Sequence, residues 1–256
     1  MCGLTGVLLY PEARSPEQWA MLQRIVTSNL ISNEIRGREA SGVVVIQRSG
    51  EYRLFKQPVA ASTLVRMMGY REAMRLIDKE TVCILGHTRM PTKGSRWHNV
   101  NNHPLLAGHV LGIHNGVIEN DDLLFSTLGL DRSGEVDSEI IFRLQDDVDP
   151  ASSNGSYAAH LQERILLLSG RFATLSVDLR RPTELLALKH LRPLCLHYDK
   201  DSHALFFSSR YVFLRKAFGR SVITEALDSG FGYCFDALSL PQLESQPACT
   251  FALTGG

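Results

Sequence analysis

The sequence lacks any apolar run long enough to cross a membrane and any excess of charge of one sign. No uninterrupted apolar stretch approaches the roughly 18 residues that a membrane helix needs. The apolar stretch Leu4–Tyr10 has no basic region before it, which argues against a signal peptide. Lysine and arginine total 27, as do aspartate and glutamate, so no net charge attracts nucleic acid or an anionic membrane. We therefore expect a cytoplasmic protein with neither nucleic acid nor membrane among its partners.

The cysteines follow no regular spacing. The chain has five of them, an odd number, and no Cys-x-x-Cys pair, which argues against a disulfide framework and against a zinc site. We interpret four as small buried hydrophobes, namely Cys83, Cys195, Cys234 and Cys249. No glycine-rich phosphate loop and no cofactor motif occurs in the sequence, so we expect neither a metal nor a cofactor.

The fifth cysteine stands at position 2. Aminopeptidases remove Met1 when a small residue follows, so the mature chain is expected to begin with Cys2. The thiol, with a free pKa of about 8.5, and the α-amino group, with a pKa of about 7.7–8.0, would then form a nucleophile and a base within one residue. A cysteine at position 2 also occurs by chance, and on this residue alone chance is the better explanation.

Hydrophobic residues make up 44% of the 256 positions, enough for one large domain. In the first third, we expect strands at Leu4–Tyr10 and Val43–Ile46, with Tyr52–Lys56 pairing to the second across Ser49-Gly50. Ser15 and Gln18 form a capping box, with Pro16 at the first helical position, and predict a helix of about four turns. A second helix is predicted at Leu64–Ile77.

Further along, the pattern predicts alternating strands and helices. A buried strand, Val82–Leu85, leads into the polar, breaker-rich stretch Gly86–Gly94, the kind of strand exit where functional groups often lie. Asn115-Gly116 ends a strand from Val110 and by itself favours a type I′ hairpin turn. Asp137-Ser138-Glu139 opens a helix, which makes a capping role for Asp137 a strong alternative to any functional one. The remaining predicted elements are a connector at 152–156, helices at 157–168 and 212–217, strands at 172–177, 185–188, 194–198, 205–208 and 231–235, and a loosely patterned tail.

Several short motifs occur in one order along the chain. They are Cys2-Gly3, Arg36-Gly37 with Ser41-Gly42, Gly86-His87-Thr88-Arg89 with Thr92 and Gly94, His103-Pro104, His114 to Asn120, and Asp137-Ser138-Glu139. This ordered set resembles the class II glutamine amidotransferase domain, an N-terminal-nucleophile hydrolase module, and most closely that of the glucosamine-6-phosphate synthases. A weaker match continues through Gly170–Ala173 and Arg192-Pro193-Leu194 and so covers nearly the whole chain.

The resemblance implies an α+β fold, a four-layer αββα sandwich of two antiparallel sheets between helices. We expect residues 1–240 to form this domain and residues 241–256 a C-terminal tail.

The resemblance also implies glutamine hydrolysis through a γ-glutamyl thioester on Cys2, which yields glutamate and ammonia. The α-amino group of Cys2 takes the thiol proton and later protonates the departing ammonia. The Asn115 side-chain amide and the Gly116 backbone N–H form the oxyanion hole, and a sharp Asn-Gly turn would direct both donors to one point.

Substrate recognition is expected at the amino-acid end of L-glutamine. The Arg89 guanidinium suits the α-carboxylate, and Asp137 suits the α-ammonium group. In the family Thr92 also lies at this end, and Arg36 supports the N-terminal loop. A structural ion pair is an equally good explanation of Arg36.

The histidines and the loop after Arg89 are less informative. We interpret His87, His103 and His114 as hydrogen-bonded scaffold, because the N-terminal amine already supplies a base. The loop departs from the family pattern: Met90 replaces a tryptophan, Pro91-Thr92-Lys93 replaces Ala-Thr-His, and Arg38-Glu39 replaces Tyr-Asp. The segment Met90–Trp97 is a candidate lid hinged at Gly94 or, equally, a rigid wall of the substrate site.

Three functions remain open from the sequence: a glutaminase that supplies ammonia to a separate acceptor-aminating synthase, another N-terminal-nucleophile amidase or acylase, and a catalytically idle glutamine-binding module. Arg89 together with Asp137 favours the first over the second, because a substrate without an α-amino acid end needs neither charge. Intact Cys2, Asn115 and Gly116 argue against the third. If Met1 is retained, the amine is displaced and the third gains. The sequence does not identify the ammonia acceptor.

Overall fold

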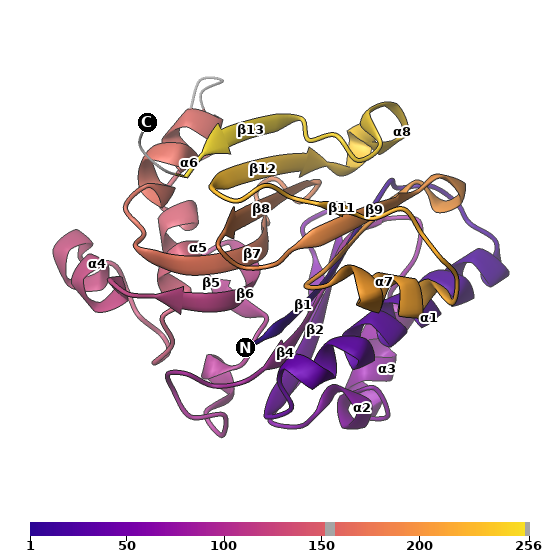
Figure 1. The fold of residues 1–256 in the computed structure, drawn as a ribbon, viewed down its shortest axis with the longest axis horizontal. Helices are drawn as coiled ribbons and strands as arrows, with labels where there is room; N and C mark the ends of the chain where they lie inside the picture. The colour runs from indigo at the N-terminus through magenta and orange to yellow at the C-terminus, as the bar shows by residue number, and fades with distance from the viewer. Residues whose placement is uncertain (152–156, 254–256) are drawn as a thin grey trace.

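Two antiparallel sheets lie face to face between two layers of helices (Figure 1). The computed structural model describes residues 1–151 and 157–253. Within them, the first sheet has the order β11-β9-β10-β1-β4-β2-β3 and the second the order β13-β12-β8-β7-β6-β5. The four-layer αββα arrangement implied by the resemblance is therefore observed. The predicted connector at 152–156 lies outside the described residues.

The strands of the first sheet are β1 (Gly3–Leu9), β2 (Ala40–Gln47), β3 (Tyr52–Gln57), β4 (Thr81–Arg89), β9 (Cys195–Asp199), β10 (Ala204–Ser208) and β11 (Glu225–Ala226). Those of the second are β5 (Leu105–Ala107), β6 (Val110–Ile118), β7 (Gly170–Asp178), β8 (Glu184–His190), β12 (Phe231–Asp236) and β13 (Cys249–Ala252). β1 is central to the first sheet, since it pairs with both β4 and β10.

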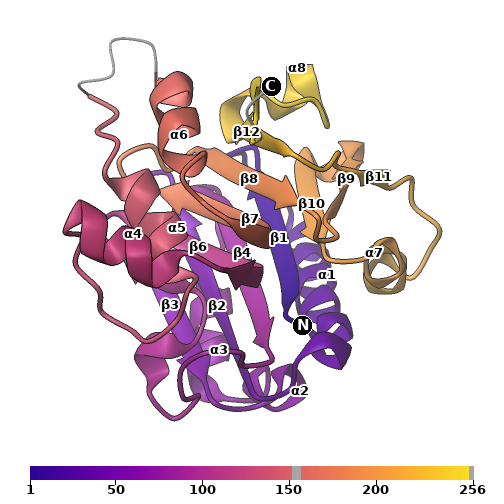
Figure 2. The ribbon, with the colours of Figure 1, turned by 60° about the vertical axis from the view of Figure 1, so that its left-hand side comes forward.

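The helices cover the two outer faces (Figures 1 and 2). Over the first sheet lie α1 (Pro16–Asn33), α2 (Ala61–Leu64), α3 (Met68–Arg75) and α7 (Tyr211–Phe218). Over the second lie α4 (Asp121–Leu128), α5 (Glu139–Asp146) and α6 (Tyr157–Ile165), while α8 (Leu240–Leu243) follows β12. Short 3-10 turns occur at Glu34–Arg36, Asn99–Asn101, Lys200–Ser202 and Ala237–Ser239. None of the described helices combines the length and apolar character that a membrane crossing requires.

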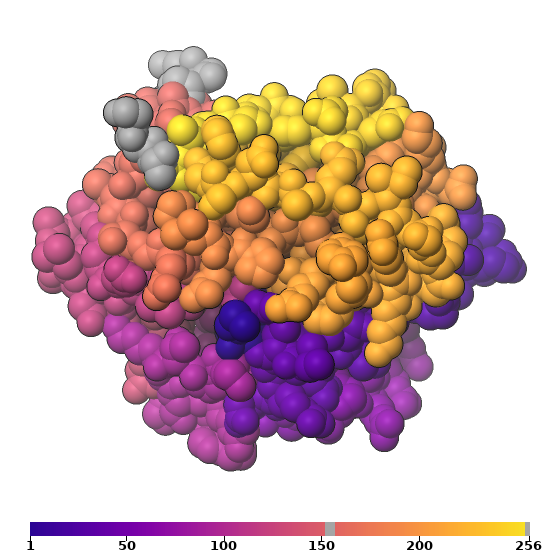
Figure 3. All heavy atoms as spheres, in the orientation of Figure 1, coloured from indigo at the N-terminus to yellow at the C-terminus, as the bar shows by residue number. Residues whose placement is uncertain are grey.

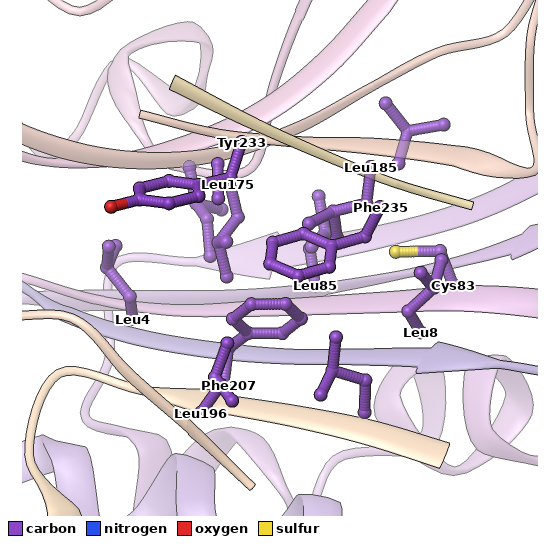
Figure 4. Packing of buried hydrophobic residues seen from close by; sticks show 14 of the residues in the cluster. Leu4, Leu8, Cys83, Leu85, Leu175, Leu185, Leu196, Phe207, Tyr233 and Phe235 are labelled. Carbon is purple, nitrogen blue, oxygen red and sulfur yellow. The ribbon is translucent and has the colours of Figure 1, made fainter. Parts of the chain in front are cut away.

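The alternation of side chains along β1 explains why it is buried on both faces. Leu4 and Leu8 point into the core between the sheets, where Phe207 and Phe235 meet edge to face with ring centroids 5.4 Å apart (Figure 4). Val7 points the other way, into the core beneath α1. Successive side chains of a strand point to opposite faces, so one apolar run serves both cores.

The start of helix α1 is as the sequence predicted. In α1 the Ser15 side chain accepts from the Gln18 backbone, the Gln18 side chain accepts from the Ser15 backbone, and Pro16 is the first helical residue. The predicted helix Leu64–Ile77 is wrong as a single element, because the chain breaks into α2 and α3 with an extended backbone at Met67. The break lets Gly69 approach the Phe55 ring, where a Cβ atom would lie only 2.4 Å from it.

Two strands run further than the sequence predicted. β4 continues through Gly86–Arg89, so these residues lie on a strand rather than in a loop. β6 continues through Asn115-Gly116 to Ile118, and the type I′ turn predicted there is wrong. Pairing with β7 extends from Val110 to Ile118, and this continuous ladder outweighs the local turn preference of Asn-Gly.

Five elements of the structure were not predicted from the sequence, namely α4, β5, β11, α8 and β13. β13 forms where a loosely patterned tail was expected, and it pairs with β12 across the register Phe231↔Ala252. Phe251 of β13 is buried in the core beneath α5 and α6. The division of the chain near residue 240 stays a prediction.

Candidate active site

The start of the chain lies where the ends of β1, β4 and β6 meet. In Figure 3 the indigo N-terminus is exposed at the centre of one face, where purple, magenta and orange segments adjoin. β1 pairs with β4 from Gly3↔Thr88 onward, so Cys2 comes just before the ladder and beside Arg89. A Cβ atom at Gly3 would lie 2.5 Å from Thr88 Oγ1, which explains glycine at this close approach.

Asn115 joins the N-terminus to the second sheet. The Cys2 backbone nitrogen donates to Asn115 Oδ1 at 2.9 Å. Asn115 is buried, and its Nδ2 has no hydrogen-bond partner among the described residues. A buried amide N–H without a partner is costly and uncommon, so this donor is available to a ligand oxygen beside Cys2.

Gly116 offers a second donor on the same strand. Alternate residues of an antiparallel strand direct their N–H groups to opposite edges. Glu119 N bonds to Ser169 O in continuation of the β6–β7 ladder, whereas Ile118 N faces the other edge and bonds to Asp137 Oδ2 at 2.7 Å. Gly116, two residues before Ile118, directs its N–H to that same edge, and β5 pairs with β6 only as far as Gly112. The Gly116 N–H therefore faces away from β7, beyond the end of β5.

The backbone at Gly116 requires glycine. Its φ is 155°, in a region that side chains rarely adopt. A Cβ atom there would lie 2.0 Å from the Arg171 carbonyl oxygen on β7. The strand can therefore carry Asn115 and Gly116 past β7 only because residue 116 has no side chain.

The Cys2 thiol is half-buried and lies 3.7 Å from the Met90 carbonyl oxygen. Burial raises the pKa of the Cys2 thiol, while the hydrogen bond to Met90, the chain terminus and the positive charge of Arg89 act in the opposite direction. With its pKa above the ordinary value, the thiol is protonated near neutral pH. Nucleophilic attack by this sulfur consequently needs a base within reach.

Arg36 holds the N-terminal residues in place. It is buried, its Nε donates to the Cys2 carbonyl oxygen at 2.7 Å, and its Nη2 lies 3.8 Å from Met1 Sδ. No carboxylate in the described part of the chain pairs with Arg36, so the structural ion pair considered from the sequence is absent there. The Arg36 guanidinium thus contacts the backbone of Cys2.

Arg89 is buried and largely occupied by its own loop. Its Nη1 donates to Asn102 Oδ1 at 2.8 Å, and its Nη2 donates to the carbonyl oxygens of Lys93 and Gly94 at 2.8 and 2.9 Å. A guanidinium has five N–H donors, so these three bonds leave about two for a ligand. Asn102, which sequence reasoning missed, is in turn supported by Lys56, whose Nζ bonds to its carbonyl oxygen at 2.6 Å.

Asp137 does not cap the helix that follows it. Its Oδ2 accepts from Ile118 N on β6, and neither it nor the N-cap residue Ser138 makes a side-chain cap to α5. The other carboxylate oxygen has no hydrogen bond within residues 1–151 and 157–253. Asp137 is 5% exposed. It is among the groups that influence the pKa of the Cys2 thiol.

The loop after Arg89 is anchored at several points. Lys93 Nζ bonds to Asp121 at 2.6 Å and to Asp122 at 2.9 Å, and Arg96 pairs with Glu39. Thr92 is exposed, and Trp97 is 69% exposed beneath the Arg96 guanidinium. In the conformation observed, this anchoring favours a fixed wall over a lid for the segment Met90–Trp97. Thr92 makes no described contact with the other site residues.

The three histidines form a buried group behind the site. His87 Nε2 donates to the His114 carbonyl oxygen at 2.9 Å, and His114 Nδ1 bonds to Ser138 Oγ at 2.7 Å. The His87 and His103 rings stack with their centroids 4.4 Å apart. His87 and His114 are thus hydrogen-bonded scaffold, as predicted, whereas neither ring nitrogen of His103 has a partner among the described residues. No cluster in this part of the chain has the side chains to hold a metal ion.

Burial of His87 generates a prediction on pH. Burial lowers the pKa of His87 to about 3, whereas an unfolded histidine titrates near 6.5. Below pH 6.5 the unfolded chain binds a proton that the folded chain does not, so folding stability falls as pH decreases toward 3 by about 1.4 kcal/mol per pH unit for this group. Urea unfolding at pH 7, 6, 5 and 4 measures the slope.

His87→Gln should have a shallower fall in unfolding free energy between pH 6.5 and 4 than the wild type. His98→Gln is the matched control, since the His98 side chain is 66% exposed, and should keep the wild-type slope. Equal slopes in the wild type and in His87→Gln would show that His87 takes up no proton on unfolding.

Known proteins with similar sequences support the resemblance stated from the motifs. No protein-family model matches the chain. The chain is 27% identical over 212 residues to a 7-cyano-7-deazaguanine synthase of Sulfolobus acidocaldarius, covering 82% of this chain and 43% of that protein. It is 25% identical over 258 residues to a glutamine–fructose-6-phosphate aminotransferase of Yersinia pseudotuberculosis, covering 96% of this chain and 39% of the relative. The chain thus spans less than half the length of these curated relatives.

A solved structure of glutamine phosphoribosylpyrophosphate amidotransferase from B. subtilis aligns with all of this chain and with 50% of its own chain, at a TM-score of 0.71 and 18% identity. This likeness confirms the fold, a sandwich of two antiparallel sheets between helices. The sequence relatives confirm the resemblance carried by the motifs and the expectation of an enzyme of this class. The chain is therefore a homologue of the class II, N-terminal-nucleophile glutamine amidotransferase domains.

Proposed function

We propose that this domain hydrolyses L-glutamine to glutamate and ammonia through a γ-glutamyl thioester on Cys2, and that the ammonia passes to an acceptor-aminating synthase. The observation that carries the proposal is that the two polar atoms of the Asn115 side chain have different surroundings. Asn115 Oδ1 accepts from the Cys2 nitrogen at 2.9 Å, while Nδ2 is buried without a partner among the described residues. The same amide thus orients the nucleophilic residue and offers a donor beside it.

Removal of Met1 creates the base. Met1 is 56% exposed, which supports access by an aminopeptidase. The nitrogen that now bonds to Asn115 then becomes an α-amino group, and it keeps the same acceptor. As a free amine it takes the proton of the Cys2 thiol, because the thiolate and not the thiol is the nucleophile. The ammonium formed later returns a proton to the departing ammonia.

The oxyanion site lies between Asn115 and Gly116. Attack of the Cys2 sulfur on the glutamine amide carbon places negative charge on the amide oxygen. Asn115 Nδ2 and the outward-facing N–H of Gly116 are the donors we assign to it. Both are held before substrate arrives, Asn115 by its bond to the Cys2 nitrogen and Gly116 by the β6–β7 ladder. Donors fixed in advance need no reorganisation as the charge develops.

Asp137 and Arg89 are the residues we assign to the amino-acid end of glutamine. Asp137 keeps one oxygen for the α-ammonium group, while the other binds Ile118 N. Arg89 retains about two of its five N–H donors for the α-carboxylate; a bidentate grip on both carboxylate oxygens requires exchange of one of its loop contacts. Thr92 lies in that loop, and its exposed position leaves it able to contact this end of the substrate.

The second part of the proposal concerns the synthase that accepts the ammonia. The curated relatives, named for synthase and aminotransferase reactions, are more than twice as long as the segment they share with this chain. These names support transfer of ammonia to a synthase, in the same or in a separate polypeptide. Large apolar side chains remain exposed beside the N-terminus, on Ile35 next to Arg36 and on Met90 next to Arg89. Such side chains suit contact with a synthase surface.

The glutaminase assay of Asn115 variants tests the proposed site. Asn115→Ala removes the Nδ2 donor and should lower kcat for glutamine by about 100- to 1,000-fold with little change in KM. Asn115→Asp keeps the acceptor for the Cys2 nitrogen but not the donor, so it should lose kcat to a similar or greater extent. Cys2→Ala defines the background rate. Glutamate formation by Asn115→Asp at the wild-type rate would contradict the oxyanion role.

A second prediction concerns recognition of the α-ammonium group. Asp137→Asn keeps an oxygen for Ile118 N and removes the charge, so KM for glutamine should rise about 10- to 100-fold, because charged hydrogen bonds contribute roughly 1.5–3 kcal/mol. The same variant should process a γ-amide that lacks the α-amino group as well as the wild type does. An equal loss on both substrates would show that Asp137 acts only through the β6 backbone.

Arg89→Lys should likewise raise KM for glutamine, since one point charge replaces a planar fork. Asn102→Ala is the matched control, because it removes a loop contact of Arg89 and leaves the charge. A rise in KM as large in Asn102→Ala as in Arg89→Lys would assign Arg89 to holding the loop.

A further inference from the structure

Cys234 and Cys249 lie directly opposite each other on neighbouring strands. β12 and β13 are antiparallel and pair in the register Cys234↔Cys249. The sequence analysis interpreted both as buried hydrophobes, which holds for Cys83 and Cys195. It is wrong for Cys234 and Cys249, which are only partly buried, because β13 is the last strand of its sheet and leaves its edge open. Both are free thiols.

The register brings the two thiols within bonding geometry. Opposed residues of an antiparallel pair have Cα atoms roughly 4.5–5.5 Å apart and side chains on the same face. A disulfide needs Cα atoms about 4.4–6.8 Å apart. The Ala248 nitrogen donates to the Cys234 carbonyl oxygen at 2.8 Å, which holds the end of β13 against β12. The backbone therefore needs no large movement for a bond between the two sulfur atoms.

A cavity gives small molecules access to the pair. It has a volume of about 300 Å³, and its lining includes both cysteines together with Tyr157, Arg181 and Glu184. Arg181 pairs with Glu184, and its guanidinium also lies over the Tyr157 ring at 5.0 Å. The Glu184 carboxylate offsets the charge of Arg181, so the cavity provides access to the thiols without a net positive charge beside them.

The two thiols differ in reactivity. The hydrogen bond between them lowers the pKa of Cys249 and raises that of Cys234, while Glu184 raises and Arg181 lowers the pKa of both thiols. Because its pKa is lowered and it lies on the edge strand β13, Cys249 is the thiol that we assign to the first attack. Thiol–disulfide exchange begins with attack by a thiolate, so Cys249 is the attacking residue and Cys234 the one that resolves the mixed disulfide.

We propose that Cys234 and Cys249 form a dithiol site that reacts with small-molecule disulfides and closes into a β12–β13 disulfide. The Cys249 thiolate attacks one sulfur of the reagent, whose S–S bond breaks, and one reagent thiolate leaves. The Cys234 thiolate then attacks Cys249 sulfur and expels the second reagent thiolate. Two protein thiols are oxidised, losing two protons in all, and the reagent disulfide is reduced to two thiols.

Closure would fix the last described strand to the sheet. The loop between the cysteines contains α8, and β13 beyond it carries buried Phe251 and the Ala252 carbonyl oxygen that accepts from Gln162 of α6. A covalent link across this loop reduces the freedom of the unfolded chain. The site uses neither Cys2 nor glutamine, and it stands independently of the proposed glutaminase.

Incubation of the full chain with oxidised glutathione, followed by blocking of free thiols and peptide mapping, tests the proposal. Cleavage after Glu244 places the two cysteines on different peptides. We expect these peptides to be joined in the wild type and separated by reductant, with no glutathione left on either cysteine. Cys234→Ser should instead keep one glutathione on Cys249. The oxidised wild type should also melt at a higher temperature than the reduced protein.

Cys249→Ser is the matched control and should show neither the joined peptides nor the rise in melting temperature. The wild-type mapping decides the question even if a variant fails to fold. Stable glutathione adducts on Cys234 and Cys249 without joined peptides, or both thiols left unreacted, would overturn the proposal.

Discussion

The hydrogen bond from the Cys2 nitrogen to Asn115 Oδ1 connects the start of the chain to the second sheet, and the candidate site depends on it. Cys2 precedes the central strand of the first sheet, and Asn115 lies on β6 of the second. The bond can form only if β1, β4 and β6 end at the same point, and the apolar core between the sheets fixes that relation. Because Oδ1 of Asn115 bonds to Cys2, the unpartnered Nδ2 of the same amide is also held near this residue.

Some buried polar groups around this bond have partners, whereas Nδ1 of His87, Nε2 of His114 and both ring nitrogens of His103 have none among the described residues. Asp137 is held by Ile118, His114 by Ser138 and Arg89 by Asn102. Each contact lowers the cost of burying a polar side chain and fixes its direction. The unpaired amide donor of Asn115 differs from these nitrogens because it belongs to the side chain bonded to the Cys2 nitrogen, and this is why we assign it to the oxyanion.

Short motifs predicted Cys2, Asn115 and Gly116 as site residues, and the structure places Cys2 and Asn115 in contact, while their catalytic roles stay predictions. The capping box at Ser15 correctly located a helix. The Asn-Gly turn failed because a ladder formed with distant β7 overrides a two-residue preference. The support of Arg89 by Asn102 depends on a loop that returns to β4, and no periodicity records such contacts. The pairing of Cys234 with Cys249 was missed because β13 was not recognised as a strand.

The central claim is that an N-terminal Cys2 carries the glutamyl group during turnover. The direct measurement is mass spectrometry of the enzyme after rapid acid quench during reaction with glutamine, followed by sequencing of its N-terminal peptide. The account predicts a peptide that begins at Cys2 without Met1 and carries a γ-glutamyl thioester on that cysteine. A chain that forms glutamate while it retains Met1, or that carries the glutamyl group on another residue, would contradict it.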